Sequence, residues 1–587
     1  MVRGEMKGPP VGRLGKVRSS QLITTFGPGA IVDLPDRDSY MVLGLHAWPR
    51  GNEIDEPNLR SVLGVGSLRA PALTKERRDV PVRRFPVVHR CPSCSRLIRG
   101  SFCQRRDCSV GAAPARFVVA CPNGHVDDFP WHWWAHSLER APAVVTTADG
   151  ATASHVTDEC SEEDGALVLD DRGASNTLSE LYVKCLKCRS SRSLRGALQP
   201  SSFRQLSCSG LRFWLADAED NCDGAVRGVL RGASNVYFSV TASALSLPRH
   251  SSPVSVLLRD HWTTLLQVSE ATRRAFLTEI LVPKGYSVDE GMAAIDSYLQ
   301  VVKTEDELRQ EEYHALCGPH ATGDLGPPAP YFQARDGAVP QKFSSLVRSV
   351  ALVDRLREVR VVRGLTRLAA RDQEAMEENS VPVAPITRGK PEWLPAVENF
   401  GEGIFLRLDA EAFRPLELDP TLAARAGAIG KAYGIWRAQR KLQPAKNLPT
   451  VTFLGLHSLA HLLIRHLSLY CGYGMASIRE RVYGVEGQAG ILIYTAAADA
   501  DGSLGGLVSF GTPQRLGAIL DAGVAHAAWC SQDPLCRDRQ PHPGEHLSGA
   551  ACHACLLLPE TSCEHGNKFL DRGMLRSDEG IALLDSL

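Results

Sequence analysis

The sequence predicts an α+β protein of several domains, in which small cysteine-rich modules are inserted in a mixed scaffold of helices and strands. Three observations lead to this fold class. The 587 residues, 44% of them hydrophobic, are enough for several cores, since one domain usually takes roughly 100–200 residues. The 17 cysteines are concentrated in short clusters. Strand-like runs punctuated by Gly and Pro alternate with longer helical patterns.

The charge balance gives no global attraction to nucleic acid or membrane. Sixty-six Lys and Arg residues match 66 Asp and Glu residues, so the formal net charge is +0. A binding site for a polyanion must therefore be a local patch. No apolar run approaches the ~20 residues that span a bilayer, and the N-terminus lacks the apolar core of a signal peptide. We expect a cytoplasmic protein without membrane contact, in which clustered thiols stay reduced and bind metal.

The first two regions are predicted from short strands and cysteine spacing. Strand-like runs such as 30–35 and 40–45 indicate a β-rich N-terminal region, residues 1–88. A cysteine-rich region follows at 89–240. Its first cluster has two closely spaced pairs about ten residues apart, a spacing that places four thiolates around one tetrahedral Zn²⁺. These cysteines are Cys91, Cys94, Cys103 and Cys108.

A second cluster in the same region has one tight pair and two widely separated cysteines. It consists of Cys185, Cys188, Cys208 and Cys222, with His155 and Cys160 as spare ligands. The arrangement is that of a zinc ribbon, in which two knuckles are joined by strand and loop. Both clusters offer four protein ligands, which is typical of structural rather than catalytic zinc.

The middle of the chain is less informative. Helical periodicity at 253–316 predicts a mainly helical region over 241–372, in which the segment after residue 344 passes from helix into strand. The proline-rich stretch 373–400 is expected to be a linker or long loop. Residues 401–587 are predicted to form a C-terminal α/β domain, with a helix over 450–473 and a strand that begins at 490 and has Asp499 and Asp501 at its C-terminal end, before a Gly-rich turn at 502–506.

The C-terminal domain is expected to be closed by a third cluster, in which five cysteines compete for four places. They are Cys530, Cys536, Cys552, Cys555 and Cys563. The pair Cys552 and Cys555 is fixed by its spacing, but spacing does not settle the other two. Three clusters together predict about three structural zinc ions. His457 and His461 are four apart on one helix face, a spacing that can hold a metal, although core or interface histidines are the favoured interpretation.

Two sets of arginines are candidates for binding DNA phosphates, with a solvated basic surface as the alternative. The first set accompanies the first cysteine cluster, and the second recurs among apolar residues further along the chain. They are Arg99, Arg105 and Arg106, then Arg348, Arg355, Arg357, Arg360, Arg363 and Arg367.

Several stretches together resemble the DrmB family, accessory proteins of the DISARM anti-phage defence system. These stretches are 18–35, 116–131, 354–368, 457–468 and 551–572. Residues 440–587 also resemble a domain that follows the motor of certain superfamily 2 helicases and ends in a cysteine cluster and an N-x-x-LD-K/R element. Here the matching residues are Cys552, Cys555 and Cys563, then Asn567, Leu570, Asp571 and Arg572. Those helicases carry a further cysteine shortly before the C-x2-C pair, which this chain lacks, so Cys536 is the first choice for the fourth ligand.

The resemblance implies a partner rather than a motor. DrmB-like proteins pair with DrmA, a superfamily 2 helicase, and the pair engages DNA. This chain has no G-x-x-x-x-G-K-[ST] loop, the nearest string being AGAIGKAYG at 426–434. We therefore expect a non-catalytic, zinc-stapled subunit of a helicase heterodimer that binds phage DNA. Two alternatives remain: a metal-dependent nuclease using carboxylates such as Asp127, Asp128, Asp499 and Asp501, and a scaffold without nucleic-acid contact.

Overall fold

The fold comes from a computed structural model of the chain. The described residues are 12–15, 17–34, 38–74, 77–105, 107–137, 160, 163–171, 177–218, 221–247, 253–258, 261–299, 304–318, 320, 331–369, 383–439, 444–445, 447–485, 487–495, 506–544, 546–559, 561–576 and 582–585. The predicted fold class is confirmed, because helices and mixed sheets carry several separate cysteine clusters.

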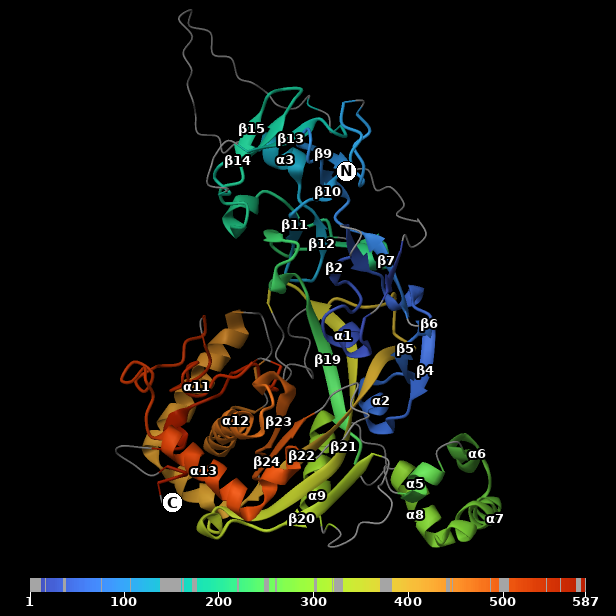
Figure 1. The fold of residues 1–587 in the computed structure, drawn as a ribbon, viewed down its shortest axis with the longest axis vertical. Helices are drawn as coiled ribbons and strands as arrows, with labels where there is room; N and C mark the ends of the chain where they lie inside the picture. Colours follow the sequence, from blue (N-terminus) through green and yellow to red (C-terminus); the bar gives the residue numbers. More distant parts are fainter. Residues whose placement is uncertain are drawn as a thin grey trace, which may run out of the picture.

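An eight-stranded sheet forms the spine of the molecule (Figure 1). Its antiparallel path is β19-β21-β22-β24-β23, with β20 also paired to β21. The strands β5 and β4 extend it, because β5 runs parallel to the start of β22. The bounds are β4 Arg50–Ile54, β5 Ser67–Pro71, β19 Phe238–Leu245, β20 Phe332–Gly337, β21 Val347–Thr366, β22 Trp393–Leu408, β23 Ile478–Tyr483 and β24 Gly490–Thr495.

Three smaller sheets, formed by the N-terminal part of the chain, lie toward the end of the spine that faces away from the C-terminal helices (Figure 1). The first, of order β1-β7-β3-β2 with β6 on β7, contains β1 Gly12–Gly15, β2 Ile31–Asp33, β3 Ser39–Val42, β6 Leu73–Thr74 and β7 Arg77–Arg84. The second, of order β10-β8-β9-β13-β14-β15, contains β8 Val88–Arg90, β9 Arg96–Arg99, β10 Ala113–Pro114, β13 Leu167–Asp171, β14 Leu181–Cys185 and β15 Ser191–Ser193. The third, of order β17-β16-β12-β11-β18, contains β11 Phe117–Ala120, β12 Val126–Asp128, β16 Leu211–Arg212, β17 Asp217–Ala218 and β18 Arg227–Leu230.

The C-terminal helices pack against the other end of the spine around α12, Val451–Cys471. The predicted helix is confirmed here, with its start fixed by the Thr450 hydroxyl, which accepts a bond from the Phe453 N–H at 3.1 Å. Gly472 ends it in the left-handed region, at φ 73°. The neighbouring helices are α10 Arg414–Leu418, α11 Pro420–Gln439 and α13 Pro513–Ala527.

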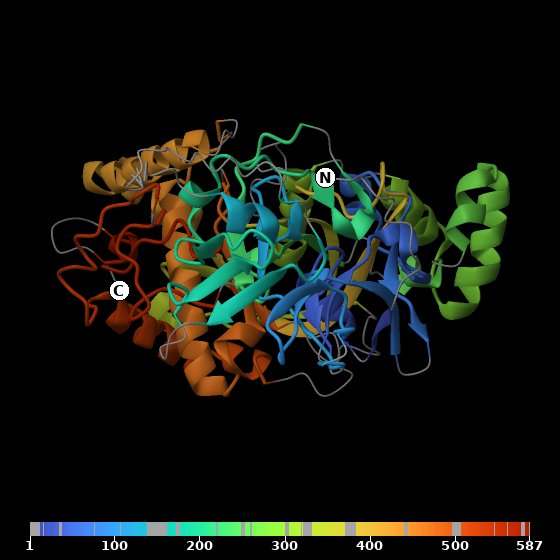
Figure 2. The same ribbon diagram turned by 90° about the horizontal axis from the view of Figure 1, so that it is seen from above.

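A small helical module has a hydrophobic cluster of its own. It consists of α5 Pro253–Leu257, α6 Trp262–Gln267, α7 Glu270–Leu281 and α8 Val288–Leu299. Figures 1 and 2 place this module and the C-terminal helices on opposite sides of the molecule. The remaining helices are α1 Ser19–Thr24, α2 Pro57–Leu63, α3 Trp131–His136 and α9 Glu305–Cys317. Among the described helices, none is both long and apolar enough to cross a membrane.

Two expectations about the middle of the chain are wrong. The segment after 344 does not pass from helix into strand as expected; it is strand throughout β21, which has 20 residues and is rich in Val. Its two faces are both largely buried, which removes the alternation that marks a strand in sequence. The expected linker at 373–400 is strand from Trp393 onward, while residues 373–382 lie outside the described residues. Pro395 is tolerated there because it lies where β22 meets β5, before β22 begins its pairing with β21 at Ala396.

Candidate metal centres

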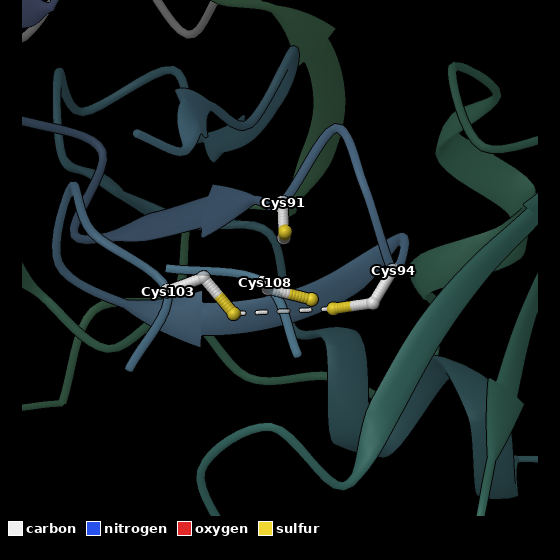
Figure 3. A group of neighbouring side chains, drawn as sticks. All are labelled: Cys91, Cys94, Cys103 and Cys108. Carbon is white, nitrogen blue, oxygen red and sulfur yellow. Dashed lines mark hydrogen bonds between the residues drawn. The ribbon is translucent and has the colours of Figure 1, made fainter. Parts of the chain in front are cut away.

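The first predicted cluster forms one compact site. Cys91 follows β8, and a tight turn, closed by a bond from the Ser95 N–H to the Cys91 carbonyl at 3.0 Å, brings Cys94 beside it. Figure 3 shows the four sulfurs of Cys91, Cys94, Cys103 and Cys108 pointing toward a common centre. The Sγ atoms of Cys94 and Cys103 lie 3.9 Å apart. A tetrahedral zinc ion with Zn–S bonds of about 2.3 Å separates its sulfurs by about 3.8 Å, so the four cysteines fit zinc.

The second predicted cluster is wrong as a single site, because the structure divides its cysteines between two centres. Cys208 and Cys222 join Cys121 and His125, which lie at the turn between β11 and β12. His125 Nδ1 is 3.4 Å from the Cys121 sulfur and 3.8 Å from the Cys208 sulfur. Gly124, at φ 86°, allows the tight turn that brings Cys121 and His125 together.

The tight pair Cys185 and Cys188 completes another centre with His136 and Cys160. His136 Nε2 is 3.1 Å from the Cys188 sulfur, and Cys160 and Cys185 have their sulfurs 3.6 Å apart. The His136 Nδ1–H donates to the His132 carbonyl at 2.7 Å, which leaves Nε2 as the ligand atom. Cys160, predicted as a spare ligand, is placed in this group, and His155 lies outside the described residues.

The third predicted cluster takes four of its five cysteines. Cys530 faces Cys552 at 3.5 Å between sulfurs, and Cys536 faces Cys555 at 3.6 Å. Cys536, the first choice for the fourth ligand, is placed in this group together with Cys530. Cys563 is placed elsewhere, because the neighbouring Ser562 carbonyl accepts a bond from the Glu480 N–H at 3.2 Å on β23. The Cys563 sulfur lies instead beside His457, His461 and Glu480.

In two of these groups, a hydrogen bond between two cysteines gives their thiols different pKa values. A hydrogen bond from Cys121 lowers the pKa of the Cys208 thiol to about 4, and one from Cys536 lowers the pKa of Cys555 to about 5. The same bonds raise the pKa of Cys121 and Cys536. The lowered pKa of Cys208 and of Cys555 favours the thiolate, which is the form of cysteine that binds metal.

Four cysteine-rich groups in the described residues therefore fit structural zinc, one more than the number of predicted clusters. Each offers four protein ligands, which leaves no open position for a catalytic water. The signals missed in the sequence are the histidines. Cys121 and His125 form a knuckle with a histidine as its second member, and His136 comes from the short helix α3, far from Cys185 in sequence.

Of the four carboxylates considered for a nuclease, the structure describes Asp127 and Asp128, and neither belongs to a metal-binding group of the described residues. Asp127 and Asp128 line a cavity of about 390 Å³ beside His125. Both Asp128 oxygens accept backbone N–H bonds, from Val87 and Val88 at 3.0 Å each, and this carboxylate therefore joins two sheets. Asp499 and Asp501 lie outside the described residues.

The predicted DNA-binding arginines separate into buried and exposed residues. Arg357 and Arg367 are 2% and 1% exposed, so the expectation that they contact DNA is wrong for this conformation. Arg357 pairs with Glu398 at 2.7 Å, and the half-buried Arg360 pairs with the buried Glu358 at 3.1 Å. Burial of the remaining predicted arginines varies: Arg355 and Arg363 are half-buried, Arg99, Arg105 and Arg348 are exposed, and Arg106 lies outside the described residues.

Comparison with known proteins agrees with this arrangement. A domain of unknown function, DUF8724, matches residues 18–238, and the MrfA Zn-binding domain matches residues 459–556. The second match contains the group of Cys530, Cys536, Cys552 and Cys555. Over 571 residues the chain is 33% identical to the DISARM protein DrmB of Bacillus paralicheniformis, covering 92% of this chain and 96% of that protein. The chain therefore belongs to the DrmB family of DISARM proteins.

Proposed function

We propose that this chain is a non-catalytic, zinc-stapled subunit that pairs with a superfamily 2 helicase and binds phage DNA in DISARM defence. The observation that carries the proposal is the near full-length similarity to the DISARM protein DrmB. The zinc-binding groups support a structural role for the metal, because their ligand sets are closed.

The absence of a nucleotide-binding loop supports a subunit without its own motor. The nearest string, 426–434, lies inside α11 rather than in a loop between a strand and a helix. Its backbone N–H groups are therefore engaged in a helix interior and do not form a cradle for phosphate. ATP hydrolysis is then the task of the partner.

Exposed apolar side chains of the C-terminal part suit a surface that meets this partner. Leu418, Leu469 and Leu535 are 78%, 79% and 80% exposed, and Trp529 is 66% exposed. Exposed large apolar side chains are frequent at protein interfaces, where aromatic residues such as Trp are enriched. A domain that is covalent in one protein and separate in another favours a stable contact, so we expect well over ~1,600 Å² buried in the pair.

Co-purification of this chain with a superfamily 2 helicase of a DISARM system tests the pairing. Leu418→Asp with Leu469→Asp is expected to weaken the complex at least about tenfold, because a charge is placed in an apolar contact. Val282→Asp is the matched control, since Val282 is 52% exposed on the separate helical module. Equal complex formation by both variants would exclude this surface, and failure of the wild-type pair to form would exclude the pairing itself.

The exposed arginines beside the first zinc group are the best candidates for phosphate contact. Arg99 and Arg105 are both exposed, on β9 and on the loop between Cys103 and Cys108. Arg99→Glu with Arg105→Glu should weaken DNA binding by the pair and reduce the slope of log affinity against log salt by about 0.9 for each phosphate that is no longer neutralised. Arg274→Glu is the control, because Arg274 is similarly exposed but lies on the separate helical module. An unchanged slope would exclude this site.

A further inference from the structure

Four metal-binding side chains meet in the interior of the C-terminal part, apart from the cysteine groups. His457 and His461 come from one face of α12, Glu480 from β23 and Cys563 from the segment that follows the last zinc group. All four are buried, and one ligand atom from each lies within 4.8 Å of every other. The Glu480 Oε1 atom is 3.0 Å from His457 Nε2 and 3.2 Å from His461 Nε2.

The backbone fixes which nitrogen of each histidine faces this centre. His457 Nδ1 lies 3.2 Å from the Phe569 carbonyl, and His461 Nδ1 lies 2.8 Å from the Leu556 carbonyl. Because a carbonyl only accepts, both Nδ1 atoms carry the proton. A neutral ring protonated at Nδ1 turns its Nε2 lone pair toward Glu480, which is the arrangement found when a histidine binds metal through Nε2.

The centre then has too few protons for its acceptors. Two Nε2 lone pairs and a carboxylate face one another, and a single thiol proton is the only donor that the four side chains supply. The second carboxylate oxygen, Glu480 Oε2, is buried and has no hydrogen-bond partner among the described residues. These acceptors need a positive charge between them. It comes either from additional protons on the buried imidazoles, which are costly to desolvate, or from a metal ion.

The Cys563 sulfur receives the same kind of backbone bond as the sulfurs of the zinc groups. It is 3.2 Å from His457 Nε2 and accepts a bond from the Asn567 N–H at 3.3 Å. Backbone N–H groups donate in the same way to Cys208, Cys222 and Cys530 in the zinc groups, at 3.4 Å each. The Cys563 side chain is therefore held by a backbone bond of the kind that the zinc-group sulfurs accept, with its sulfur turned to the same centre as the two Nε2 atoms and Glu480.

We propose that His457 Nε2, His461 Nε2, a Glu480 carboxylate oxygen and Cys563 Sγ bind a further structural zinc ion. Zinc accepts nitrogen, oxygen and sulfur ligands together in tetrahedral geometry, whereas softer or harder metals favour more uniform sets. The four side chains leave no open position and are all buried, so the role of the ion is to fasten the segment around Cys563 to α12 and β23. This inference is independent of the pairing with a helicase.

Zinc content of the full-length chain tests the site. Wild-type protein should hold one zinc ion in each cysteine-rich group and one more here, and Cys563→Ala or His461→Gln should hold one fewer than wild type. Cys471→Ala is the matched control, because Cys471 lies on the same helix outside the metal groups and should leave the content unchanged. A folded Cys563→Ala variant with the wild-type zinc content would overturn the inference.

Anomalous scattering decides the case if the variants do not fold. Diffraction at the zinc edge from crystals of the wild-type chain should give a peak between His457, His461, Glu480 and Cys563. A map with peaks at the four cysteine-rich groups and none at this position would overturn the inference and assign the centre to protonated histidines.

Discussion

Arg367 joins three parts of the N-terminal half through its guanidinium group. It donates to the carbonyls of Gly29, Gly124 and Val236 at 2.9, 2.8 and 2.5 Å, and it lies over the Trp214 ring at 5.2 Å. Burial lowers the pKa of Arg367 to about 10, which still leaves the side chain charged at neutral pH. This arginine therefore has a structural role: it holds three backbone segments together, close to the knuckle of Cys121 and His125.

Removing this side chain should cost more than removing an exposed arginine. Arg367→Met leaves three buried carbonyls without their donor, which should lower the free energy of unfolding by roughly 3–5 kcal/mol. Arg348→Met is the control, because Arg348 is 61% exposed and its ion pair with Asp409 should contribute at most about 1 kcal/mol. Urea denaturation of both variants makes the comparison, and similar midpoints would contradict the fastening role.

Glu358 gives the stability of the spine a predictable dependence on pH. Burial opposes ionisation, but Arg360, Arg479 and Arg481 outweigh it and hold the pKa of this carboxyl well below its usual 4.5. A depressed pKa stabilises the folded state at pH values above 4.5, and this contribution is lost as the pH falls below that value.

Glu358→Gln should therefore lower the free energy of unfolding by roughly 3–5 kcal/mol at pH 7, because buried arginines lose their partner. The difference from wild type should be constant between about pH 8 and pH 5 and should narrow below pH 4.5. Denaturation midpoints measured across this range provide the test. A difference that grows in acid would show that the sign is wrong.

At the scale of the element, each zinc knuckle follows from local sequence, whereas its partners do not. The turns at Cys91–Cys94 and Cys552–Cys555 are recognised from spacing alone, because two residues between cysteines fix their separation. Cys208 lies closer in sequence to Cys185 than to Cys121, yet sheet pairing between β12 and β16 brings it to Cys121. Spacing cannot reveal such a pairing. For the same reason, the sequence does not predict that Glu480 on β23 lies beside the histidines of α12.

Zinc stoichiometry distinguishes the observed grouping from a single ribbon of Cys185, Cys188, Cys208 and Cys222. Cys121→Ser and Cys160→Ser should each remove one zinc ion per chain, because each takes a ligand from a separate closed site. Cys317→Ser should remove none, since Cys317 lies outside the metal groups. Unchanged zinc in both folded ligand variants would favour the single ribbon.

At the scale of the whole molecule, the long strands β21 and β22 connect the N-terminal zinc groups to the helical C-terminal part. Proposed DNA contacts beside the first zinc group and the proposed helicase contact around α12 thus lie toward opposite ends of one spine. A connection of this kind suits a subunit that extends the DNA path of its partner. The sequence predicts both ends by their motifs, but the continuous strand between them is hidden because both of its faces are buried.

The salt dependence of DNA affinity tests the central claim most directly. DNA binding is measured for the helicase alone and for the purified pair over a range of salt concentrations. The account predicts tighter binding by the pair and a steeper slope of log affinity against log salt, by about 0.9 for each additional phosphate that is neutralised. Identical affinities and slopes with and without this chain would contradict it.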